Sequence, residues 1–124
     1  MIDDELAAIV GIAKSFHVGK LSMVQLVEQS RYRALRPQLN IALLQRFLKE
    51  HPEHLEEWDL YSEDKRTDGG SFLLRLGPIW EVGDITRRAD EYYPSRSRRR
   101  FFLSHSRARA SFILRELDAV ATDV

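Results

Sequence analysis

Carboxylates are the side chains whose number and spacing could most readily do chemistry in this chain. Seven acids and no lysine or arginine lie between positions 50 and 64: Glu50, Glu53, Glu56, Glu57, Asp59, Glu63 and Asp64. Two carboxylates in different environments can serve as general acid and general base. These acids instead follow a solvated helix face, and no GxSxG, HExxH or P-loop motif accompanies them. We therefore predict that the protein is not an enzyme.

The same acidic segment has two non-catalytic interpretations. A helix that carries many carboxylates can enter the groove where a nuclease holds its phosphate backbone, and it can speed association with a basic partner. It can equally be a charged, solvated helix face that binds nothing. Both interpretations stay open at this point.

An arginine-rich segment balances the acidic one. Six arginines and no acid lie between positions 96 and 109: Arg96, Arg98, Arg99, Arg100, Arg107 and Arg109. The net charge of +0 therefore hides two poles. Phe101 and Phe102 could stack on bases, which would make the protein a small DNA- or RNA-binding regulator. In the other interpretation, which we favour, the phenylalanines alternate into the core and the arginines pair with the protein's own acids or stay solvated.

The histidines give no recognisable metal site. His51 and His54 are three residues apart, but a third ligand at a typical spacing is missing, so we expect solvated surface histidines, no metal and no cofactor. The chain has no cysteine and opens with acids at Asp3 and Asp4, where a signal peptide would be basic. No apolar run reaches the roughly 18 residues of a membrane span. We expect a cytoplasmic protein without a membrane partner.

Helical periodicity fills the N-terminal half of this 124-residue chain. We predict helices over about 3–16, from Ser22, over 39–50 and over 52–62, with a connection over 30–37. The two middle helices could form a DNA-binding helix-turn-helix, but the connection is long for that motif and the acids that follow would repel phosphates.

Strand patterns begin after Gly70. Segments 71–76 and 79–85 predict an antiparallel hairpin around Gly77-Pro78, 86–97 a long loop, and 100–103 a third strand. An apolar stripe then predicts a last helix that Ser104 or Ser106 caps. The expected fold is a single α+β domain (1–124), with three or four N-terminal helices, an antiparallel sheet of two to three strands and a C-terminal helix packed on it.

Two patches resemble a known family. The run Trp58-Asp-Leu-Tyr-Ser-Glu-Asp-Lys-Arg-Thr-Asp-Gly-Gly and the helix Ala108-Arg-Ala-Ser-Phe-Ile-Leu-Arg-Glu-Leu117 resemble the immunity proteins of bacterial polymorphic-toxin and contact-dependent growth inhibition systems. The likeness covers about 58–82 and 108–120, under half of the chain. The family pattern has an aromatic pair after the glycines, where this chain has Ser71-Phe72, so one aromatic is missing.

The resemblance implies a protein that binds a cognate toxin domain, a nuclease, and blocks it without chemistry. The residues expected to meet the toxin are the acids of the fourth helix and two loop tyrosines: Glu53, Glu56, Glu57, Asp59, Glu63, Asp64, Tyr92 and Tyr93. Trp58 or Tyr61 could anchor the interface, but if helical packing buries Trp58, the anchor falls to the loop tyrosines. Lys65, Arg66 and Thr67 could simply end a helix and turn the chain into the sheet.

Overall fold

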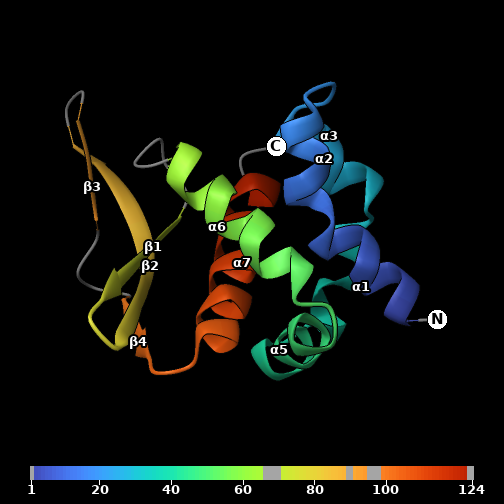
Figure 1. The fold of residues 1–124 in the computed structure, drawn as a ribbon. Coiled ribbons are helices and arrows are strands. Elements are labelled where there is room, and N and C mark those ends of the chain that lie inside the picture. Colours follow the sequence, from blue (N-terminus) through green and yellow to red (C-terminus); the bar gives the residue numbers. More distant parts are fainter. Residues whose placement is uncertain (1, 66–70, 89–90, 95–98, 123–124) are drawn as a thin grey trace.

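The computed structural model describes residues 2–65, 71–88, 91–94 and 99–122, and for 2, 64–65, 85–88, 91–94 and 122 it describes the backbone alone. Helices make up the N-terminal half and the C-terminus (Figure 1). They are α1 (Ile2–Val10), α2 (Ile12–Val18), α3 (Met23–Gln29), α4 (Tyr32–Leu35), a 3-10 helix (Arg36–Gln38), α5 (Ile41–Glu50), α6 (Glu53–Lys65) and α7 (His105–Thr122).

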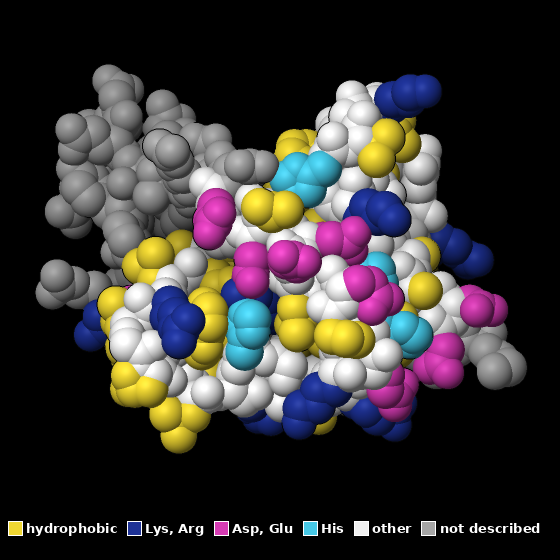
Figure 2. Space-filling model, in the orientation of Figure 1, with side chains coloured by type: hydrophobic (Ala, Val, Ile, Leu, Met, Phe, Trp, Pro, Cys, Tyr) yellow, Lys and Arg dark blue, Asp and Glu magenta, His cyan; other side chains and the backbone are white. Residues whose placement is uncertain are grey.

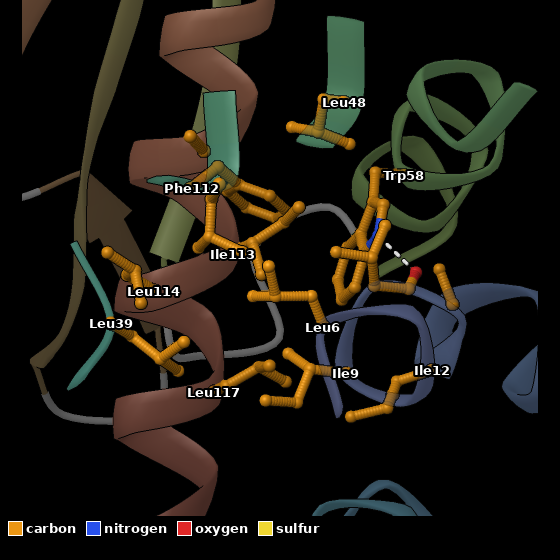
Figure 3. Close-up of a cluster of buried hydrophobic side chains, with 14 of the residues drawn as sticks. Leu6, Ile9, Ile12, Leu39, Leu48, Trp58, Phe112, Ile113, Leu114 and Leu117 are labelled. Carbon is orange, nitrogen blue, oxygen red and sulfur yellow. Dashed lines mark hydrogen bonds between the residues drawn. The ribbon is translucent and has the colours of Figure 1, made fainter. Parts of the chain in front are cut away.

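The helix α7 lies at the centre of the fold, between the sheet and the N-terminal helices (Figure 1). It contacts α5, α3 and α6 on one side and β1, β2 and β4 on the other. Ser104 begins it as predicted, because its Oγ accepts a hydrogen bond from the Arg107 N–H at 3.3 Å. Phe112, Ile113 and Leu117 of α7 are fully buried and meet Leu6 and Ile9 of α1 in the core (Figure 3).

The N-terminal helices are more divided than the sequence predicts. The expected helix over 3–16 is two helices that meet at Gly11, whereas the predicted cap of the next helix is confirmed by a reciprocal pair of bonds between Ser22 and Gln25. The connection predicted over 30–37 is wrong, because α4 and the 3-10 helix lie there. Arg31, at φ 61°, starts the new turn, and Pro37 stands at the beginning of the 3-10 helix, where its missing N–H is not needed.

The sheet has four strands: β1 (Ser71–Leu76), β2 (Ile79–Arg88), β3 (Glu91–Pro94) and β4 (Arg100–Phe102). The predicted hairpin is confirmed, with Gly77 in the turn at φ 62°. β3 and β4 pair antiparallel with successive stretches of β2, so the sheet is three strands wide. The long loop predicted over 86–97 is therefore wrong in part, since β2 runs to Arg88 and β3 follows. Thr86, Tyr92 and Tyr93 favour strands, but the charges around them hid the pattern.

The two faces of the sheet differ. Strand register puts Leu73, Trp80, Val82 and Phe102 on the face that packs against α7. The other face leaves four large apolar side chains between 37% and 52% exposed: Leu74, Leu76, Ile79 and Phe101. The α+β class and the C-terminal helix packed on the sheet are both as predicted.

Candidate partner-binding surface

The outer face of α6 carries a row of exposed carboxylates. Glu53, Glu56, Leu60 and Glu63 follow one another at spacings of three or four residues and are all exposed. Figure 2 shows acidic side chains gathered in the middle of this view, where α6 lies in Figure 1. Neither Glu56 nor Glu63 has an ion-pair partner among the described residues, and Glu53 has only His51 at 3.8 Å. We call these four residues the acidic row.

Glu57 and Asp59, on the other sides of the same helix, are used within the protein. The Glu57 Oε1 lies 2.7 Å from the Nδ1 of His54, and both side chains are largely covered. His54 also stacks on Phe47. The expectation of solvated surface histidines is therefore wrong for His54, because its ring completes the packing between α5 and α6.

Asp59 pairs with a buried arginine. An ion pair joins its Oδ1 to Nη2 of Arg109, whose side chain is 2% exposed. The guanidinium lies 4.3 Å from the ring centre of Trp80, which places it over the aromatic face. Nε and Nη1 of Arg109 have no hydrogen-bond partner in the described structure, so Asp59 and the Trp80 ring are what stabilise its charge.

Burial lowers the pKa of Arg109 to about 9. At neutral pH the group is still protonated, so removal of Asp59 would leave a buried cation without its carboxylate. Asp59, from the acidic segment, and Arg109, from the arginine-rich segment, thus join α6 to α7. We call this contact the seam.

His105 completes this seam. Its ring stacks on the ring of Trp80, with 4.4 Å between the ring centres and 13° between the ring planes. Its Nε2 lies 3.4 Å from Oδ2 of Asp59. Burial and then the positive charge of Arg75 lower the pKa of His105. The imidazole is accordingly neutral at pH 7.

A buried carboxylate joins α6, α7 and β1. Glu116 of α7, 2% exposed, accepts hydrogen bonds from the Tyr61 hydroxyl at 2.5 Å and from the Ser71 N–H at 2.9 Å. Burial, with the nearby charge of Glu116, raises the pKa of Tyr61. Trp58 is also buried, and its Nε1 donates to the Val10 carbonyl at 2.8 Å (Figure 3). The two expected anchors on α6, Trp58 and Tyr61, therefore belong to the core.

The segments 58–82 and 108–120 meet at Glu116. Tyr61 and Ser71 come from the first segment, and Glu116 from the second. Arg115 of the second segment also bonds Asp84, at 3.2 Å. Tyr61, Arg115 and Glu116 thus serve the packing of the fold.

The described structure does not include the side chains of the remaining predicted toxin-binding residues. The side chains of Asp64, Tyr92 and Tyr93 lie outside the described residues, as do Arg66 and Thr67; the backbone places Asp64 in the last turns of α6 and both tyrosines in β3. In the part of the chain that is described, no group of three or more possible ligands could hold a metal ion.

The arginine-rich segment divides between structure and surface. Arg109 is buried, and Arg99 pairs with Glu81 at 3.4 Å. Phe102 packs against the core, whereas Phe101 faces outward and is 52% exposed, so the two phenylalanines alternate between the core and the surface. Arg96 and Arg98 lie outside the described residues.

Sequence reasoning missed the seam itself. Arg109 and Glu116 fall on the same helical stripe as Phe112, Ile113 and Leu117, and that spacing predicts buried charges in α7. Such charges need partners, and for Arg109 a search for them would have pointed to the acids of α6.

A scan against models of known families, a search of curated proteins and a search of solved structures each found no match. None of the helices in the described segments is long and apolar enough to span a bilayer.

Proposed function

We propose that this chain is an immunity protein of a bacterial polymorphic-toxin or contact-dependent growth inhibition system. It binds the toxin domain made in the same cytoplasm and blocks it without transforming a substrate. The exposed acidic row carries the proposal, because it presents three exposed carboxylates, two of which have no ion-pair partner among the described residues, and such a row suits a basic partner surface such as a nuclease cleft. The family resemblance supplies the biological setting.

The row is suited to this role by its rigidity. From Glu53 to Glu63 it extends about 15 Å along α6, at roughly 1.5 Å per residue. The bonds of Trp58, Asp59 and Tyr61 to other elements fix the helix behind it. Because the helix backbone is already held in place, binding orders only the side chains of the row, which limits the loss of conformational entropy.

The proposed interface is smaller than the sequence suggests. Glu57 and Asp59 have partners within the chain, so we assign the toxin contacts to Glu53, Glu56 and Glu63. Leu60, 52% exposed in the middle of the row, offers the apolar contact that the buried Trp58 and Tyr61 cannot.

Growth rescue tests this proposal. The C-terminal domain of a secreted protein encoded beside this gene would be induced in a laboratory bacterium, with and without the chain. We expect arrest without the chain, growth with it, and a stable complex of the two proteins on gel filtration. Absence of both rescue and complex would reject the proposal. A salt-sensitive complex of the chain alone with DNA or RNA would favour the nucleic-acid alternative.

A further inference from the structure

A hollow of about 540 Å³ runs along one side of α7, bounded also by the 3-10 helix, the start of α5 and β4. Its volume lies within the roughly 300–1,000 Å³ that is typical of small-molecule sites. Its described lining contains five charged residues, four arginines and one aspartate: Arg36, Arg100, Arg107, Arg115 and Asp118. We call it the arginine hollow. None of its lining residues belongs to α6 or the acidic row.

Two of these arginines are held in place by carboxylates. Arg36 binds Asp118 through Nε at 2.8 Å and Nη2 at 3.1 Å, and the hydrogen bond raises the pKa of Arg36. The Tyr32 hydroxyl donates to the same carboxylate at 2.7 Å. Arg115 is fixed by Asp84 at 3.2 Å. One end of the hollow is therefore a rigid, hydrogen-bonded framework.

The other two arginines are not neutralised. Arg100 and Arg107 are exposed, and neither has an ion-pair partner in the described structure. Arg107 also lies in the first turn of α7, which contains no acid. The positive end of a helix dipole disfavours a cation at this position, so Arg107 gains no stability from it. Among the described residues, the hollow therefore keeps a surplus of positive charge that no carboxylate neutralises.

We propose that the arginine hollow binds a nucleoside phosphate. The guanidinium groups of Arg100 and Arg107 present forked donors that match phosphate oxygens. A bare phosphate would fill little of the hollow, whose lining also contains apolar side chains: Leu39, Ile41, Ala42 and Leu114. These provide a wall for a base. A free mononucleotide and the terminal nucleotide of an oligonucleotide share this chemistry.

Calorimetric titration at low salt tests the proposal on the full chain. The probes are ADP, adenosine, inorganic phosphate and a single-stranded hexanucleotide. The variant is R100Q/R107Q, whose two exposed side chains can change without disturbing the core. K14Q/K20Q is the matched control, because it removes two exposed cations that lie outside the hollow.

We expect ADP to bind the wild type and K14Q/K20Q equally, and to bind R100Q/R107Q at least about tenfold more weakly, since charged hydrogen bonds are lost. Adenosine and phosphate alone should bind more weakly than ADP. Displacement of the hexanucleotide by ADP would identify the terminal nucleotide as a second source of the ligand.

Three results would each overturn the proposal: no ADP binding at millimolar concentration, equal ADP binding by R100Q/R107Q, or a hexanucleotide complex that ADP does not displace. The last would point to an extended nucleic-acid surface. The first two results would leave toxin binding untouched, because it rests on a different set of residues, whereas the third would also favour the nucleic-acid alternative to the proposed function.

Discussion

The inner and outer faces of α6 carry the same kind of side chain in opposite surroundings. On the inner face, the carboxylate of Asp59 is paired with Arg109 beneath Trp80. On the outer face, Glu56 and Glu63 are exposed and have no ion-pair partner in the described structure. Position on the helix, rather than residue type, decides whether an acid stabilises the fold or is free to meet a partner.

The largest expected effect is the loss of the inner ion pair. Asp59→Asn leaves the guanidinium of Arg109 buried without its carboxylate, which should lower the free energy of unfolding by about 3 kcal/mol. Urea unfolding measures this. Glu56→Gln on the outer face is the matched control and should change stability by less than about 0.5 kcal/mol. Equal effects of the two substitutions would show that the two faces do not differ.

The buried carboxylate of α7 should have the next largest effect. Glu116→Gln removes the charge that accepts bonds from Tyr61 and Ser71, with an expected loss of about 2 kcal/mol in urea unfolding. Tyr61→Phe removes one of these donors. The double variant should lose less than the sum of the single losses, and strict additivity would mean that the two groups do not act together.

How far the sequence predicts this molecule depends on whether a feature is local. The Ser22 cap, the 71–85 hairpin and the last helix follow from short-range patterns, and the structure has them. The pairing of Asp59 with Arg109 joins residues 50 positions apart, so it depends on how α6 and α7 pack. The arginine hollow likewise combines the 3-10 helix, β4 and α7, which periodicity alone cannot bring together.

His105 gives the inner face a pH dependence. Because its pKa is lower in the folded protein than the usual 6.5, the unfolded chain binds more protons just below that pH. Its contribution to stability is therefore complete above about pH 6.5 and declines as the pH falls toward the folded-state pKa. Unfolding measured between about pH 7 and pH 5 should show a steeper decline for the wild type than for His105→Gln. Identical slopes would contradict the assigned direction.

The smallest expected effect on stability belongs to the acidic row. The triple variant E53Q/E56Q/E63Q removes three exposed charges, and we expect its unfolding midpoint in urea to stay within the equivalent of about 0.5 kcal/mol per site. A much larger loss would mean that the row also serves the fold. A small gain is compatible with relief of repulsion between like charges along the helix.

The association rate of this triple variant with the toxin domain tests the central claim most directly. The rate constant would be measured by stopped-flow fluorescence at about 50 mM and 500 mM salt, since added salt screens exposed charges. We predict that the wild type associates at least about tenfold faster than E53Q/E56Q/E63Q at low salt, and that the difference nearly vanishes at high salt. Equal rates at low salt would contradict the assignment of the acidic row as the partner-binding surface.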